Sequence, residues 1–106
     1  MIYELRTYTL CPGGLGPWLK LYEEKALPIF AAIEDMRLVG YFRTETGCLN
    51  RVVHLWCYPS LQARESVLRA LAAHPDWDAK FVQPARPYLM SQETTFLSPV
   101  AFSPLP

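Results

Sequence analysis

The chain lacks a surplus of charge of either sign, since 10 lysine and arginine residues balance 10 aspartate and glutamate residues and the formal net charge is zero. Proteins that bind nucleic acids or anionic membranes use a basic surplus, so we expect neither as a partner. No apolar run approaches the roughly 20 residues that cross a bilayer. The segment Met1–Arg6 has no apolar signal-peptide core. These absences favour a cytoplasmic protein.

Histidine and cysteine are also scarce, with two and three residues in the whole chain. A metal site needs three or four converging ligands, and His54 and Cys57 fall on opposite faces of an expected strand. We therefore expect no metal and no resident cofactor. An odd number of cysteines without a CxxC pair favours a reduced compartment. Phosphate-binding, dinucleotide-binding and zinc-protease motifs are all missing.

Apolar and aromatic residues, by contrast, are abundant: 51% of the 106 residues are hydrophobic, 13% are aromatic and only 19% are charged. This composition excludes a disordered chain, and the length fits one domain. A domain this small has much surface and few charges to cover it. We expect the remaining apolar surface to be buried against a partner subunit.

The periodicity of apolar residues predicts strands over 2–10, 37–45, 51–58 and 88–97, and helices over 17–35 and 61–74. The resulting order, βαββαβ, is typical of a ferredoxin-like α+β domain, in which a four-stranded antiparallel sheet carries both helices on one face. We assign residues 1–98 to this domain and 99–106 to a proline-rich tail.

Particular residues set the expected helix ends. Pro28 should kink or split the first helix after Leu27, and Ser60 is a suitable N-cap for the second helix. A short helical piece through Trp77 and Phe81 is expected after Pro75. Pro84 and Pro87 are expected to bracket a connector that leads to the last strand.

The hairpin between residues 37 and 58 determines the two faces of the sheet. Pairing Glu45 with Arg51 places Phe42 opposite His54. In this register neither face of the sheet is polar enough to be exposed to water. One predicted face holds Leu38, Gly40, Phe42, Thr44, Val52, His54, Trp56 and Tyr58, and the other holds Val39, Tyr41, Arg43, Val53, Leu55 and Cys57. Because the helices cover only one face, we expect a second copy of the sheet on the other, as a homodimer.

The chain resembles the NIPSNAP family in four segments spread over nearly its full length. The first is Tyr3-Glu4-Leu5-Arg6-Thr7-Tyr8 followed by Pro12-Gly13, and the second is the hairpin from Gly40 to Tyr58. The others are Pro75-x-Trp77, preceded by Arg64 in the second helix, and Ser91-Gln92-Glu93 with Phe102-Ser103-Pro104. The resemblance implies a dimeric α+β barrel. That superfamily includes cofactor-independent monooxygenases, muconolactone isomerases and haem-binding proteins, whereas the NIPSNAP branch has little settled biochemistry.

Polar residues within otherwise apolar strands form the candidate site. Arg6 and the third-strand residue His54 should meet, because the first strand lies beside the third in this fold. His54 would act as a general acid or base, and Arg6 would stabilise an anion. These two are the catalytic candidates. The ligand-binding candidates are Tyr8, Thr44, Glu45, Asn50, Trp56, Tyr58, Trp77 and Glu93. A small aromatic or acidic molecule would suit them.

Structural roles for the same residues stay open. Arg6 would then form a buried ion pair with Glu4 or Glu93, and His54 would be a core residue. Two classes of function follow. The first is a dimeric barrel that binds a small organic molecule, with cofactor-independent monooxygenase or isomerase-like activity. The second is a non-catalytic dimeric structural or protein-interaction domain. A pocket between sheet and helices favours the first, and a solid core the second.

Overall fold

The computed structural model describes all residues from 1 to 106, and it contains one antiparallel sheet of four strands. The strands are β1 (Ile2–Leu10), β2 (Arg37–Arg43), β3 (Arg51–Tyr58) and β4 (Leu89–Leu97). Their order across the sheet is β2-β3-β1-β4, so β1 lies between β3 and β4. The predicted ferredoxin-like α+β class is confirmed, and the strand ends differ from the prediction by at most two residues.

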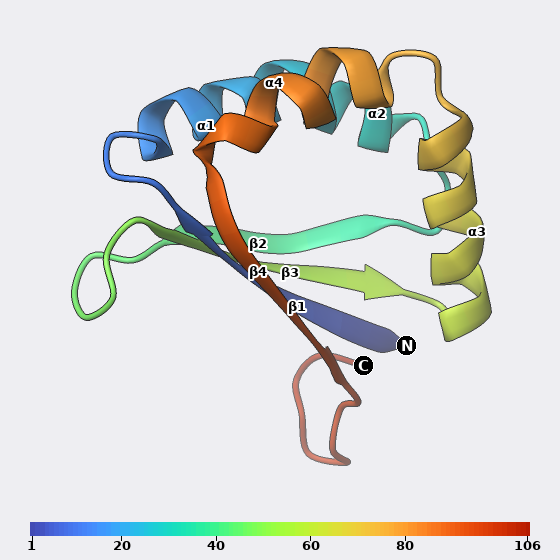
Figure 1. Ribbon diagram of the computed structural model, residues 1–106. Coiled ribbons are helices and arrows are strands. Elements are labelled where there is room, and N and C mark those ends of the chain that lie inside the picture. Colours follow the sequence, from blue (N-terminus) through green and yellow to red (C-terminus); the bar gives the residue numbers. More distant parts are fainter.

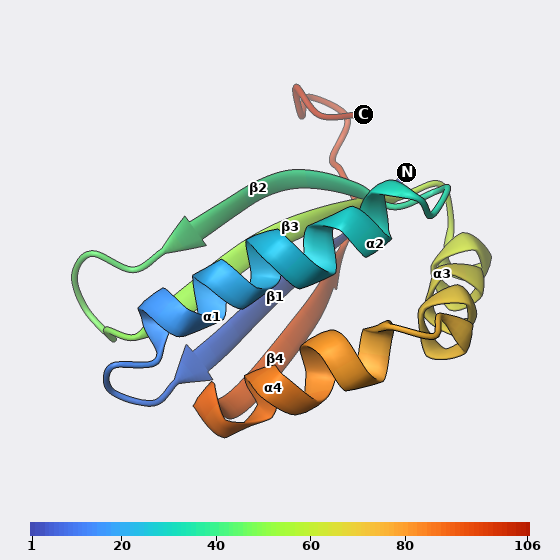
Figure 2. The ribbon, with the colours of Figure 1, turned by 90° about the horizontal axis from the view of Figure 1, so that it is seen from above.

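Two helical rods cover one face of the sheet (Figures 1 and 2). The first rod runs through α1 (Leu15–Leu21), the π-helical η1 (Tyr22–Ala26) and α2 (Leu27–Ala31). The expected split after Leu27 is absent, since the π-helical η1 ends at Ala26 and α2 continues from Leu27 through Pro28. Proline is tolerated in the first turn of α2, where no intrahelical N–H partner is required.

The second rod comprises the π-helical η2 (Trp77–Val82), α4 (Gln83–Ala85) and the 3₁₀ turn η3 (Arg86–Tyr88). The helical piece through Trp77 and Phe81 is confirmed, but the connector expected at Pro84 and Pro87 is wrong. Both prolines lie in the first turn of their elements, where the missing N–H costs nothing.

Helix α3 (Leu61–Ala73) stands beyond the end of the sheet and does not lie flat on it (Figures 1 and 2). Ser60 caps it as predicted, since its Oγ accepts a hydrogen bond of 3.1 Å from the Ala63 backbone N–H. Only Val67 and Leu71 of α3 are buried. The second layer over the sheet is therefore the rod from Trp77, which adds Phe81 and Ala85 to the core.

The hairpin register differs from the prediction by one residue. Tyr41 pairs with His54, and a bulge between Leu38 and Gly40 shifts the pairing further along β2. Tyr41 therefore faces the helices, where its ring stacks on His54 at 4.4 Å. Phe42 turns to the outer face and is 62% exposed. Its ring covers Gly40 so closely that a Cβ there would come within 2.7 Å of it.

The two faces of the sheet differ in what covers them. Beneath the rods lies an aromatic core that includes Trp18, Tyr22, Phe30, Trp56, Tyr58 and Phe81. The outer face has no helix on it (Figure 1), and its centre is the apolar pair Leu5 and Leu55. The tail after β4 turns back below this face, where the Tyr3 hydroxyl donates a 2.8 Å hydrogen bond to the Pro106 carbonyl.

We predict that Ser60→Ala lowers the free energy of unfolding by about 1 kcal/mol, because the cap of α3 is lost. Urea denaturation followed by circular dichroism measures this. Ser66→Ala is the matched control, since Ser66 is exposed in mid-helix and bonds only to the Gln62 carbonyl and Arg69. Equal stability losses in the two variants would contradict the role assigned to the cap.

Candidate functional site

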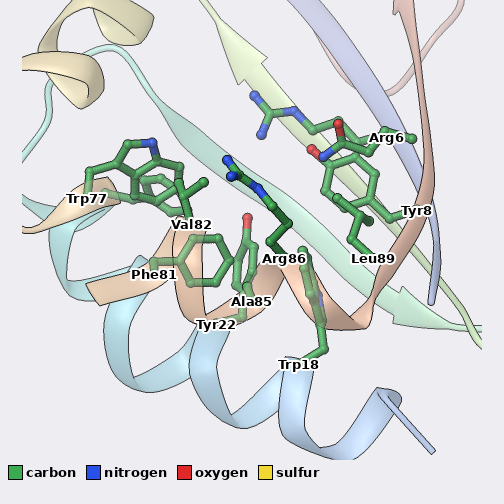
Figure 3. A pocket seen from close by; sticks show the side chains of 12 residues that line it. Arg6, Tyr8, Trp18, Tyr22, Trp77, Phe81, Val82, Ala85, Arg86 and Leu89 are labelled. Atoms are coloured by element: carbon green, nitrogen blue, oxygen red, sulfur yellow. The ribbon is translucent and has the colours of Figure 1, made fainter. Parts of the chain in front are cut away.

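A cavity of about 230 Å³ lies between the sheet and the two helical rods (Figure 3). Nine of its 12 lining residues are hydrophobic. They come from β1, both rods and β4. The complete lining is Arg6, Tyr8, Trp18, Tyr22, Phe30, Trp77, Phe81, Val82, Ala85, Arg86, Leu89 and Gln92. Ligand sites for drug-sized molecules are about 300–1,000 Å³, so this one suits a ligand with a single ring.

Aromatic rings from the two rods form one wall of the cavity. Trp77 and Phe81 stack at 5.0 Å with planes 25° apart, and Tyr22 meets Phe81 edge-on at 5.4 Å. Tyr22 belongs to the π turn η1, and the other two belong to the π turn η2. Such turns are rare in proteins, and those that occur are often found at functional sites. Here they direct large rings from opposite rods toward one space.

The polar part of the lining is basic. Arg6 and Arg86 are the charged residues, and no acidic side chain lines the cavity. The hydroxyl of Tyr8 and the amide of Gln92 complete the polar edge, near Arg6 in the sheet. Two positive groups beside aromatic rings favour a ligand that combines a flat ring with an anionic group.

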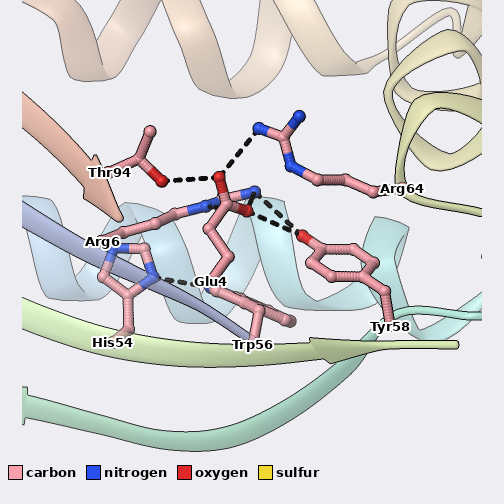
Figure 4. Close-up of polar contacts among 7 residues, drawn as sticks. All are labelled: Glu4, Arg6, His54, Trp56, Tyr58, Arg64 and Thr94. Atoms are coloured by element: carbon pink, nitrogen blue, oxygen red, sulfur yellow. Dashed lines mark hydrogen bonds and ion pairs between the residues drawn. The ribbon is translucent and has the colours of Figure 1, made fainter. Parts of the chain in front are cut away.

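Glu4 holds Arg6 in place through a buried network (Figure 4). The Glu4 side chain is 1% exposed, and its Oε1 accepts hydrogen bonds from Arg6 Nε at 3.0 Å and the Tyr58 hydroxyl at 3.1 Å. Its Oε2 accepts from Arg64 at 2.8 Å and from the Thr94 hydroxyl at 2.7 Å. The alternative in which Arg6 pairs with Glu4 is thus the arrangement observed.

The network sets the charge state of its members. Burial alone would raise the pKa of Glu4, but the hydrogen bond from Arg64 and the charge of Arg6 outweigh it and lower the pKa to about 2. Burial raises the pKa of the Tyr58 phenol to about 12. At neutral pH Glu4 is therefore ionised and Tyr58 is protonated, so both keep the hydrogen bonds that orient Arg6.

A polar groove of about 380 Å³ shares Arg6, Tyr8 and Gln92 with the cavity. Its other lining residues are Glu4, Arg64, Leu68, Glu93 and Thr94. Arg6 thus stands between an aromatic chamber and a polar one. Its guanidinium gives Nε and Nη2 to Glu4 and Tyr58, which leaves Nη1 outside these bonds.

His54 lies outside the cavity wall. It is fully buried, with Tyr41 stacked on it and the Tyr8 ring edge-on at 4.8 Å. Its Nδ1 accepts a 2.7 Å hydrogen bond from the Trp56 indole N–H. Burial, followed by the charge of Arg6, lowers the pKa of His54 to about 3. A neutral imidazole behind Tyr8 does not support the role of general acid.

The other residues named from the sequence lie in three places. Tyr8 and Trp77 line the cavity with Arg6, and Glu93 lines the groove. Trp56 and Tyr58 are buried behind the cavity, in contact with His54 and Glu4 respectively. Thr44, Glu45 and Asn50 lie on the β2–β3 loop and line neither space; Glu45 pairs with Arg43 there at 3.3 Å.

Sequence reasoning missed Trp18, Tyr22 and Arg86 as site residues. Tyr22 belongs to the apolar stripe of the first helix, so it signalled only core packing. Arg86 fell in the expected connector, and nothing in the pattern placed it against the sheet. The spacing of Trp77 and Phe81, one helical turn apart, was the available signal that a second aromatic rod faces the first.

Comparison with known proteins identifies close relatives. The sequence pattern that defines NIPSNAP proteins matches residues 3–104. NipSnap homolog 3B of Mus musculus is 38% identical and NipSnap homolog 1 of Danio rerio is 36% identical, each over 98% of this chain. The chain spans 41% of the first relative and 36% of the second, which is less than half of their lengths.

Solved structures of NIPSNAP proteins also resemble this chain in sequence and in fold. An uncharacterized NIPSNAP domain protein from Burkholderia xenovorans is 38% identical with a TM-score of 0.89, and the match covers 98% of this chain and 99% of that one. A NIPSNAP family protein from Agrobacterium tumefaciens is 37% identical with a TM-score of 0.92, covering 99% and 98%. A candidate antibiotic biosynthesis monooxygenase from Caulobacter crescentus has a TM-score of 0.71 at 15% identity, covering 93% and 89%, and shares the fold alone.

The lowered pKa of His54 predicts that acid destabilises the protein from near pH 6.5 downward. Between pH 6.5 and 3 the histidine is protonated in the unfolded state but not in the folded state. The free energy of unfolding therefore falls by at most about 1.4 kcal/mol for each unit by which the pH is lowered. Glu4 adds its loss only below about pH 4.5. Urea denaturation between pH 7 and 5 should show that the free energy of unfolding falls with pH. His54→Gln should flatten this slope, and His74→Gln should keep it. Equal slopes in all three proteins would refute this assignment.

Proposed function

We propose, for a chain that belongs to the NIPSNAP family, that the cavity between the sheet and the helical rods binds a small aromatic molecule carrying an anionic group. The observation that carries this proposal is the lining itself, in which Arg6 and Arg86 meet stacked aromatic rings without any acidic side chain. Because Glu4 fixes Arg6 at 2.9–3.0 Å, the cation is preorganised for a ligand and needs no rearrangement to bind one.

The chemistry that such a site favours is the stabilisation of an anion formed on the ligand. Cofactor-independent oxygenation and isomerisation of aromatic or enolic acids both proceed through an enolate-like or phenolate-like anion. Arg6 would bind that negative charge in a largely apolar space, where an electrostatic interaction is stronger than in water. The fold shared with a candidate monooxygenase is compatible with this activity and does not assign it.

We further propose a homodimer formed through the outer faces of two sheets. In the single chain this face carries the partly buried pair Leu5 and Leu55 at its centre and Phe42 at 62% exposure. Water-exposed apolar surface of this kind is typical of a subunit interface. Three free cysteines, Cys11, Cys48 and Cys57, agree with the cytoplasmic location we propose.

The alternative function is a non-catalytic dimeric domain that acts through protein contacts. Phe102 favours it, because this tail residue is 90% exposed and makes no hydrogen bond that holds it to the domain. No helix of the structure is long and apolar enough to span a membrane. The cavity supports the small-molecule function, because it holds positive charge beside an open aromatic chamber.

Calorimetric titration with benzoate tests the ligand. We expect saturable binding that Arg86→Gln weakens about tenfold, because one charge-assisted hydrogen bond is lost. Arg86 is exposed and outside the Glu4 network, so this variant should fold normally. Arg69→Gln is the matched control, as Arg69 is an exposed arginine on α3 that bonds to Ser66. Absence of benzoate binding, or equal weakening by both variants, would count against the proposal.

Sedimentation equilibrium tests the dimer. The wild-type chain should be dimeric at micromolar concentration, and Leu55→Lys should give a folded monomer, because a buried unpaired charge destabilises the interface. Leu61→Lys is the control, since Leu61 is an exposed leucine at the start of α3, away from the outer face of the sheet. A wild-type monomer, or a dimer that survives Leu55→Lys, would exclude the proposed interface.

A further inference from the structure

The hydroxyl of Tyr22 is a buried polar group without a partner. Tyr22 is 5% exposed, and its Oη has no hydrogen bond to any atom of the chain. Burying a hydroxyl without a hydrogen bond is costly, so native structures leave few such groups unless the partner is a ligand or a water molecule. Phenylalanine would pack the same ring without this cost, which makes the hydroxyl a feature that needs an explanation.

The surroundings of Tyr22 place this hydroxyl at the cavity. The ring lines it beside Trp18 and Phe81, and its hydroxyl end points toward the side on which Arg86 lies (Figure 3). The rings of Tyr41 and His54 lie 4.8 and 5.8 Å from the Tyr22 ring, but neither forms a hydrogen bond with its hydroxyl. The cavity that Tyr22 lines is therefore the space from which a ligand can supply the missing partner.

Burial also fixes the form of the group. It raises the pKa of Tyr22 well above that of a free phenol, so the hydroxyl stays neutral and can both donate and accept a hydrogen bond. The cavity thus presents two different polar groups to a ligand: guanidinium groups for negative charge, and a neutral hydroxyl for an oxygen atom on the ring.

We propose that the ligand of this cavity is a single-ring aromatic acid with a hydroxyl group on the ring, that is, a member of the hydroxybenzoate class, and that Tyr22 is the residue that recognises the ring hydroxyl. This inference rests on the proposed function and narrows it. The exposed side chain of Arg86, which lines the same cavity, binds the carboxylate, and the Tyr22 hydroxyl forms a hydrogen bond with the ring hydroxyl.

The test compares benzoate with 2-, 3- and 4-hydroxybenzoate by calorimetric titration of the full chain. At least one isomer should bind about three- to tenfold more tightly than benzoate, which is the effect of one additional buried hydrogen bond. The corresponding methoxybenzoate should lose the gain, because a methyl ether cannot donate a hydrogen bond to the Tyr22 oxygen.

Two variants separate Tyr22 from the site as a whole. Tyr22→Phe should bind benzoate as the wild type does and should bind the preferred hydroxybenzoate no better than benzoate. Arg86→Gln should weaken both ligands by the same factor and keep their ratio. Thermal unfolding checks the fold, and Tyr22→Phe should be at least as stable as the wild type, since it removes an unsatisfied buried hydroxyl.

The outcomes distinguish this inference from the proposed function. If benzoate binds and no hydroxybenzoate binds more tightly, or if Tyr22→Phe retains the preference, the assignment of Tyr22 is overturned while the aromatic-acid site stands. In that case a water molecule is the partner of the Tyr22 hydroxyl. If none of the four acids binds, both the site and the role of Tyr22 are overturned.

Discussion

Glu4 is a carboxylate buried on the helical face of the sheet, and the arrangement of the site depends on it. It accepts hydrogen bonds from β1, β3, α3 and β4, through Arg6, Tyr58, Arg64 and Thr94. Removing a charge from water is costly, and two cations and two hydroxyls offset that cost here. The same bonds fix the direction of Arg6. One buried residue therefore joins four elements of the fold and presents the cation that lines the cavity.

Much of the fold was predictable because local signals agreed with the tertiary structure. The periodicity of apolar residues marked the strands, and Ser60 marked the start of α3. The hairpin register was not predictable, since Tyr41 and Phe42 are adjacent aromatic residues and either suits the core by composition. The choice is made by long-range contacts: Tyr41 stacks on His54 and accepts the hydrogen bond of Trp18. A one-residue shift in register exchanges the two faces.

Apart from Trp77 on the second rod, the candidate site was predictable only on the sheet. Arg6 and Tyr8 are two residues apart on β1, so the two-residue period of a strand predicted that they share a face. The residues from the helical rods did not follow, because Tyr22 and Phe81 reach the cavity through π turns, and helical periodicity in the sequence does not show where a turn widens. Arg86 required knowing that Pro84 and Pro87 begin short helical turns and do not interrupt the rod.

The position of α3 has a consequence for the motions of the molecule. This helix buries only Val67 and Leu71 and stands clear of the sheet, so the link from Arg64 to Glu4 is a large part of what holds it. An element with so few buried contacts is a separate unit of local unfolding, which opens at a lower free energy than the sheet does. Hydrogen exchange in α3 would then be faster than in β1 and β3. Because Arg64 also lines the polar groove, each opening of α3 would admit solvent to Glu4 and Arg6.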